Sequence, residues 1–102
     1  NNEQLNYIGI KGQDVTKEIA DKIGIPKGVL VTTIQPDSPA MQSGIKEQDV
    51  IVKFNDDKIT SLKQYHDSMD KCKPGQKVAI TAMRRGAEGY GELPFEVTVG
   101  EN

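Results

Sequence analysis

The chain is poor in aromatic residues and cysteine. Its 102 residues include no Trp, two Phe, three Tyr and a single Cys. One cysteine excludes an internal disulfide, and with only one His it also excludes a Cys/His zinc site. A chain of this length forms one domain with a modest core, and that core must consist mainly of aliphatic side chains and Met.

Long apolar runs and a one-sided charge are also absent. No apolar run approaches the roughly 20 residues that a membrane span needs, and no signal peptide is visible. The formal net charge is −2, with lysines and acids interspersed. This balance argues against a nucleic-acid partner and predicts a solvated surface. Because the chain begins with Asn1 rather than Met, we expect it to be a piece of a longer protein.

The remaining patterns alternate between short strands and short helices. Strand-like runs cover residues 7–12, 29–34, 49–54, 77–83 and 93–99. Thr16, Ser38 and Ser61 are each suited to cap the start of a helix, and Ser61 with Gln64 has capping-box spacing. Gly24 and Gly44 are suited to end the first two helices. These signals predict a small, mostly antiparallel β domain capped by helices.

The segment Tyr7-Ile8-Gly9-Ile10 is an unusual start for a strand, because a glycine interrupts its apolar residues. Glycine in a strand often marks a close approach by another backbone or a ligand. Successive amides of Ile8, Gly9 and Ile10 could converge on an anion. An ordinary edge strand with a bulge at Gly9 explains the tetrapeptide equally well, so the segment alone leaves both interpretations open.

No catalytic, metal-binding or cofactor-binding pattern is found. Cys72 and His66 are six residues apart and do not face each other squarely on one helix. Asn55-Asp56-Asp57 lacks the ligand spacing of a calcium loop. The glycines at 86, 89 and 91 do not open a helix after a strand, and there is no Gly-x-Ser-x-Gly elbow. We therefore expect no active site and no cofactor in this chain.

Several motifs occur together in one order along almost the whole chain. They are Tyr7-Ile8-Gly9-Ile10, Gly28-Val29-Leu30-Val31, Ser38-Pro39-Ala40, Gly44-Ile45-Lys46, Asp49-Val50-Ile51, Phe54-Asn55, Pro74-Gly75 and Arg84-Arg85-Gly86. With them the chain resembles a PDZ domain, most closely that of bacterial HtrA-family serine proteases. The resemblance implies a partly open antiparallel barrel or sandwich of five to six strands with two to three helices. We expect one domain over residues 1–102, with residues 1–6 as a disordered flank.

The resemblance also implies a peptide-binding site. A peptide carboxylate would bind the loop Tyr7, Ile8, Gly9 and Ile10, and the peptide would add as a strand beside Lys11 and Gly12. The helix carrying Tyr65, His66 and Met69 would form the opposite wall. Core packing is as compatible with Tyr65 and Met69 as groove lining is, and His66 fits a solvated position better than a contact. Residues 85–91 are expected to form a flexible hairpin loop, and the loop Arg84 to Gly91 looks longer and richer in glycine than the family's tight hairpin.

The function implied is recognition of hydrophobic C-termini or unfolded segments for a trypsin-like protease domain N-terminal to Asn1. Such a parent would act outside the cytoplasmic membrane, with a membrane anchor as one option, and this domain itself would not insert into the membrane. One alternative is a PDZ domain of another bacterial protease, such as a C-terminal processing, site-2 or Lon-like enzyme. A further alternative, from a different functional class, is a structural domain that binds no peptide.

Overall fold

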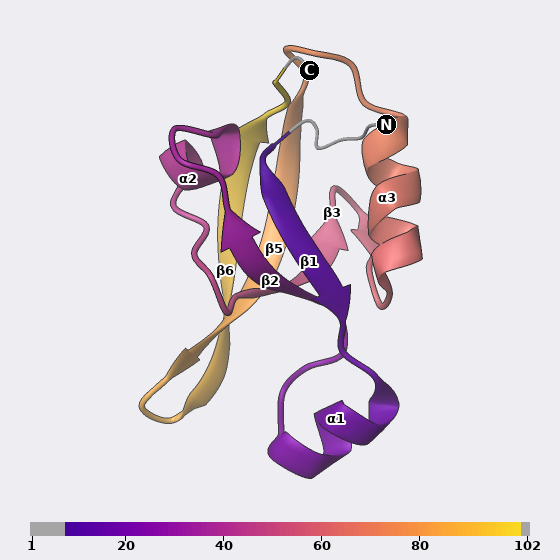
Figure 1. Ribbon diagram of the computed structural model, residues 1–102, viewed down its shortest axis with the longest axis vertical. Helices are drawn as coiled ribbons and strands as arrows, with labels where there is room; N and C mark the ends of the chain where they lie inside the picture. Colours follow the sequence, from indigo (N-terminus) through magenta and orange to yellow (C-terminus); the bar gives the residue numbers. More distant parts are fainter. Residues whose placement is uncertain (1–7, 101–102) are drawn as a thin grey trace.

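The computed structural model describes residues 8–100, which form one six-stranded antiparallel sheet and three helices (Figure 1). The sheet order is β1-β2-β3-β5-β6, and the short β4 pairs with β3. The strands are β1 Ile10–Asp14, β2 Val29–Ile34, β3 Val50–Phe54, β4 Asp57–Lys58, β5 Lys77–Gly86 and β6 Gly89–Thr98. The sheet does not close, so β1 and β6 are its two edges. This confirms the predicted fold class.

The helices begin at the predicted caps. They are α1 Lys17–Ile23, α2 Pro39–Ser43 and α3 Leu62–Asp70. Each cap hydroxyl accepts a hydrogen bond from the backbone N–H three residues later, at 3.1–3.2 Å. The capping box at α3 is only half formed, because the Gln64 side chain accepts from the Thr60 N–H at 2.6 Å rather than from that of Ser61.

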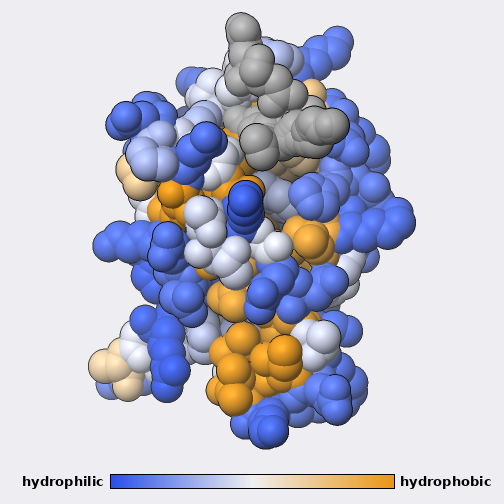
Figure 2. Space-filling view, viewed as in Figure 1, coloured by the Kyte–Doolittle hydropathy of each residue, from blue (hydrophilic) through white to orange (hydrophobic). Residues whose placement is uncertain are grey.

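The core is aliphatic, as the composition predicts. Its buried members include Ile8, Val29, Val31, Ile45, Ile51, Phe54, Ile59, Tyr65, Met69, Val78, Ile80 and Val97. Helix α1 contributes no buried residue, and its Ile19 and Ile23 are 39% and 62% exposed. Figure 2 shows the resulting apolar patch at the lower end of the molecule, where α1 lies in Figure 1. The apolar side chains Ile19 and Ile23 of this helix therefore do not pack into the core.

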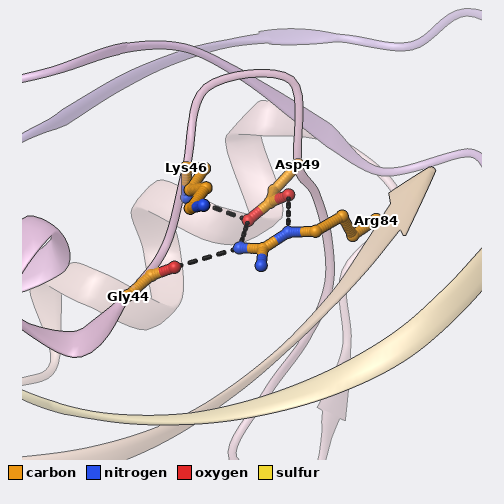
Figure 3. A network of polar contacts seen from close by, with 4 residues as sticks. All are labelled: Gly44, Lys46, Asp49 and Arg84. Atoms are coloured by element: carbon orange, nitrogen blue, oxygen red, sulfur yellow. Dashed lines mark hydrogen bonds and ion pairs between the residues drawn. The ribbon is translucent and has the colours of Figure 1, made fainter. Parts of the chain in front are cut away.

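A charged network fastens the loop before β3 to strand β5 (Figure 3). Arg84 donates two hydrogen bonds of 2.8 Å to the Asp49 carboxylate and one of 2.9 Å to the Gly44 carbonyl. The Lys46 N–H donates to the same carboxylate at 2.9 Å. The Asp49 side chain is 2% exposed and that of Arg84 is 32% exposed. These hydrogen bonds raise the pKa of Arg84, so the guanidinium remains a cation beside the buried carboxylate.

Two predicted boundaries are wrong. The first strand begins at Ile10 and extends to Asp14, rather than covering residues 7–12, because Gly9 has a φ of +83° that is not extended backbone. The predicted hairpin at residues 85–91 is present, but its loop is tight rather than long and flexible. Strands β5 and β6 stay paired out to Gly86 and Gly89, leaving only residues 87–88 as the turn. Gly89, with a φ of +112°, supplies the left-handed backbone that this turn requires.

Candidate functional site

The outer edge of β6 is protected against pairing with another strand. The Val99 N–H donates to the Gln76 carbonyl at 2.8 Å, so the backbone N–H of Val99 points toward β5. Along an antiparallel pair, residues whose N–H and C=O point toward the partner strand alternate with residues whose N–H and C=O point away from it. Pro94 and Glu96 consequently face outward. Pro94 has no N–H to offer, and the Glu96 carbonyl accepts a hydrogen bond of 3.0 Å from Ser43 of α2. This edge is therefore a poor template for an added strand.

The edge of β1 is different. The Gln35 N–H donates to the Gly9 carbonyl at 2.8 Å, so Gly9 and Gln35 form a hydrogen-bonded pair. The next pair of the β1–β2 ladder, Ile10 and Ile34, is therefore one whose residues do not bond each other. The N–H and C=O of Ile10 therefore point away from β2. Beside it, Lys11 is exposed, and its carbonyl accepts a hydrogen bond of 3.2 Å from Thr32.

Beyond Lys11 the register shifts by one residue, and the extra residue, Thr32, lies on β2. The Val31 N–H donates to the Asp49 carbonyl, and the Val31 carbonyl accepts from the Gln48 N–H, both at 2.8 Å. Both backbone groups of Val31 thus point away from β1. The N–H and C=O of Gly12, which pairs with Val31, therefore also point outward, and those of Asp14, two residues later, do the same. Within residues 8–100, the backbone groups of Ile10, Gly12 and Asp14 have no partner outside the β1–β2 ladder. This is an open strand edge.

The loop that leads into β1 has its carbonyls bonded and its amides free. The Ile8 carbonyl accepts from the Ala40 N–H at 3.0 Å, one of the donors that the first turn of α2 leaves unpaired, and the Gly9 carbonyl is bonded to Gln35. Within the described chain, the amides of Ile8 and Gly9 find no acceptor. Tyr7, the first residue of the predicted carboxylate loop, lies outside the described residues.

Helix α3 lies beside β1 and runs in the opposite direction (Figure 1). The Leu62 N–H at the start of the helix donates to the Asp14 carboxylate at the end of β1, at 2.6 Å. Leu62 belongs to the first turn, whose N–H groups have no partner within the helix. The side chain of Asp14 thus ties the end of the open strand to the start of the helix.

The predicted wall residues of α3 occupy two kinds of environment. Tyr65 and Met69 are 5% and 3% exposed and belong to the same core cluster as Ile8, with Ile10 packed against it. Burial raises the pKa of the Tyr65 phenol, because the phenolate would be desolvated. His66 is exposed, with its ring 5.5 Å from that of Tyr65. Ile8, Ile10, Tyr65 and Met69 thus share one apolar cluster, and core packing is the main role of Tyr65 and Met69.

A hollow of about 230 Å³ lies at the start of β1, over its pairing with β2. It is lined by Gly9, Ile10, Lys11, Thr33, Ile34, Gln35 and Pro36. A wider one of about 490 Å³ shares Ile34 and is lined also by Met41, Gly44, Ile45, Lys46 and Glu47. Both linings are mostly apolar or backbone. Their charged residues are Lys11 in the first and Lys46 and Glu47 in the second, and neither lining contains a His, Cys or Ser.

The described residues also contain no cluster of three or more His, Cys, Asp or Glu side chains that could hold a metal ion. The Cys72 thiol donates to the Ser68 carbonyl at 3.5 Å, and partial burial raises its pKa. A raised pKa leaves less of the reactive thiolate. Over the same residues, no helix is long and apolar enough to cross a membrane.

The sequence interpretation gave no role to Asp14, Asp49 or Arg84. Asp49 and Arg84 were noted only as parts of motifs, and their pairing joins positions 35 residues apart. Asp14 carried no signal beyond its place after a strand, since its partner Leu62 is 48 residues away.

Comparison with known proteins defines the class to which this fold and this open edge belong. A family model described as PDZ domain matches residues 6–94, so the chain belongs to the PDZ family. Among curated proteins it is similar to a probable periplasmic serine endoprotease, DegP-like, from Hahella chejuensis. The two are 32% identical over 97 residues, which cover 88% of this chain and 21% of that protein. The chain thus spans about a fifth of that relative's length.

Solved structures agree with this assignment. A serine endoprotease from Yersinia pestis matches with a TM-score of 0.72 and 27% identity, over 95% of this chain and 29% of the other. The HtrA3 PDZ domain bound to a phage-derived ligand matches with a TM-score of 0.74 and 24% identity, over 93% of this chain and 85% of the other. The latter likeness supports the fold. The chain is thus similar to a part of two serine endoproteases and to nearly the whole of one PDZ domain, that of HtrA3.

Proposed function

We propose that this chain is a peptide-binding module that captures hydrophobic C-termini, or extended unfolded segments, by adding them as a strand to β1. The observation that carries the proposal is the contrast between the two sheet edges. The β6 edge is protected by Pro94 and by the Ser43 contact at Glu96. On β1, the outward-facing backbone groups of Ile10, Gly12 and Asp14 have no partner among residues 8–100. An extended peptide can complete such an edge with main-chain hydrogen bonds.

In this proposal the carboxylate of the peptide binds the amides of Ile8, Gly9 and Ile10, as the loop's bonded carbonyls and free amides suggest. Several preoriented N–H donors can share one negative charge, and such charge-assisted bonds are stronger than neutral ones. The last side chain of the peptide would rest on the apolar surface formed by Ile8, Ile10, Tyr65 and Met69. Lys11 and Gly12 would flank the added strand.

Tyr65 and Met69 would form the floor of this pocket and His66 its rim. Met is unbranched and adaptable, so the pocket should accept several apolar residues. Burying a Leu- or Val-sized side chain there would contribute about 1.5–3 kcal/mol.

The module would serve a serine endoprotease domain elsewhere in the same parent chain. This part of the proposal rests on the names of the relatives, of which the chain spans only about a fifth. Those relatives are described as periplasmic, which supports a parent located outside the cytoplasmic membrane. The module itself would bind substrate without cleaving it. A different protease parent would be revealed by the residues encoded upstream of Asn1, examined for a Ser/His/Asp set.

The test compares one hydrophobic peptide made as the free acid and as the C-terminal amide, titrated by NMR. Hydrogen bonds to charged groups contribute about 1.5–3 kcal/mol, so the amide should bind roughly 10- to 100-fold more weakly. The amide signals of residues 8–14 should shift, while those of Glu92 and Glu96 on the protected β6 edge serve as an internal control. Equal affinities would refute carboxylate binding. Absence of binding by either peptide would favour a purely structural domain.

A further inference from the structure

We propose that Asp14 selects a basic residue four positions before the C-terminus of the bound peptide. This inference rests on the proposed strand addition to β1 and adds a chemical preference to it. It starts from one contact: the Asp14 carboxylate accepts the Leu62 N–H at 2.6 Å and is held by it at the junction of β1 and α3.

The position of the peptide relative to Asp14 follows from strand geometry. If the terminal residue lies opposite Ile10, an antiparallel peptide places its third-last residue opposite Gly12 and its fifth-last opposite Asp14. The bulge does not disturb this count, because its extra residue is Thr32 of β2. Side chains opposite one another on neighbouring strands share one face of the sheet. The fifth-last side chain of the peptide therefore emerges beside the Asp14 carboxylate.

The charge of Asp14 is available for such a partner. Within residues 8–100 its second oxygen, Oδ2, accepts no hydrogen bond and forms no ion pair. Three lysines lie within three residues of the junction, and Lys11 is on the opposite face of β1 from Asp14, because successive side chains of a strand alternate. The other two are engaged elsewhere. Lys17 pairs with Asp21 and Lys63 with Asp67, both at 2.9 Å across one helical turn. A Lys or Arg of the peptide would thus be the nearest new cation, and a Glu there would be repelled.

The anchoring bond gives this carboxylate a fixed place that a free surface aspartate lacks. An exposed ion pair usually gains little, partly because both side chains must be ordered when it forms. Here Asp14 is already held by Leu62, so only the peptide side chain has to be ordered.

The experiment uses acetylated hexapeptides that end in a free Val, with Leu two residues earlier and Lys or Glu four residues before the terminus. All other positions are Ala. At low ionic strength we expect the Lys peptide to bind about three- to tenfold more tightly than the Glu peptide. In Asp14→Asn, which keeps the Oδ1 acceptor, the ratio should fall below about twofold, since the attraction and the repulsion are both removed. Glu88→Gln, which removes one charge at the distant turn between β5 and β6, should leave the ratio unchanged.

A shorter peptide separates this inference from the proposed function. The last four residues alone do not reach Asp14, so they should bind wild type and Asp14→Asn equally. Binding of this tetrapeptide together with an unchanged Lys/Glu ratio in Asp14→Asn would overturn the selectivity and leave strand addition standing. Weaker tetrapeptide binding by the variant would show that Asp14 acts only by positioning α3. Failure of all the peptides to bind wild type would refute the proposed function itself.

Discussion

Gly9 and Ser38 approach each other so closely that no side chain fits between them. A Cβ placed on Gly9 would lie 2.4 Å from the Cβ of Ser38 and 3.0 Å from its hydroxyl oxygen. Ser38 is fixed in turn, because it caps α2 through a hydrogen bond from the Met41 N–H at 3.2 Å. The loop that is proposed to bind the carboxylate is thus shaped by the start of α2.

Gly9→Ala should therefore lower stability and weaken peptide binding together. The left-handed backbone costs about 1–2 kcal/mol for a residue with a Cβ, and the clash with Ser38 should bring the total loss to about 2–4 kcal/mol. Urea unfolding and peptide titration measure the two effects. Gly24→Ala is the matched control: its φ is +73° but no atom lies within 4 Å of the added Cβ, so it should lose only about 1 kcal/mol and bind normally. Equal losses in the two variants would mean that the contact with Ser38 is unimportant.

Arg84→Met should destabilise the domain by leaving the carboxylate of Asp49 buried without its cation. Removing one partner of a buried pair costs about 3–5 kcal/mol, and because Arg84 is 32% exposed we expect a smaller loss, about 1.5–3 kcal/mol. Arg85→Met, at the exposed neighbouring residue, should change the free energy of unfolding by no more than about 0.5 kcal/mol. Chemical denaturation of both variants tests this, and indistinguishable midpoints would contradict it.

Tyr65 should make the domain less stable at alkaline pH. Burial raises the pKa of its phenol, with a smaller contribution from the Cys72 thiolate, whereas in the unfolded chain a tyrosine ionises near pH 10. The stabilisation is therefore complete below about pH 10 and is lost progressively as the pH rises above that value, because only the unfolded state releases the proton.

The measurement is the urea midpoint of wild type and Tyr65→Phe at about pH 8 and about pH 11. The fall in stability between the two should be clearly smaller in Tyr65→Phe. Tyr90→Phe, in the hairpin of β5 and β6, should behave as wild type. The Cys72→Ala variant isolates the contribution of the thiol, whose pKa burial also raises. If the stability of Tyr65→Phe fell as much at alkaline pH as that of wild type, ionisation of Tyr65 would not be the cause.

Pro94→Val should promote self-association of the folded domain. The change adds a backbone N–H at an outward-facing position of β6, where the edge now offers none, and unprotected edges pair with other chains. Ala79→Val is the control, because it adds a similar apolar side chain on β5 where the N–H is already bonded to Asn55 at 2.9 Å. Light scattering at several concentrations should separate the two variants. Purely monomeric Pro94→Val would show that Ser43 and the twist of the strand suffice to protect this edge.

Elements specified by neighbouring residues were readable from the sequence. The caps at Thr16, Ser38 and Ser61 act over three residues, and the structure places each helix immediately after them. The strand at 29–34 was equally clear, because β-branched residues dominate it. The glycine-rich stretch at 85–91 misled the prediction, since glycine is as compatible with a tight two-residue hairpin turn as with a flexible loop.

Composition and residues a few positions apart account for the aliphatic core, the helix starts and the unusual Gly9 among apolar residues just before the first strand. Which sheet edge is open depends instead on the strand order and on the contact between Ser43 and the Glu96 carbonyl, which exist only in the folded chain. The tertiary structure also decided that Asp14 reaches Leu62 and that Asp49 reaches Arg84, across 48 and 35 residues. Such pairs leave no periodic trace in a single sequence, because the folding of the whole sheet brings them together.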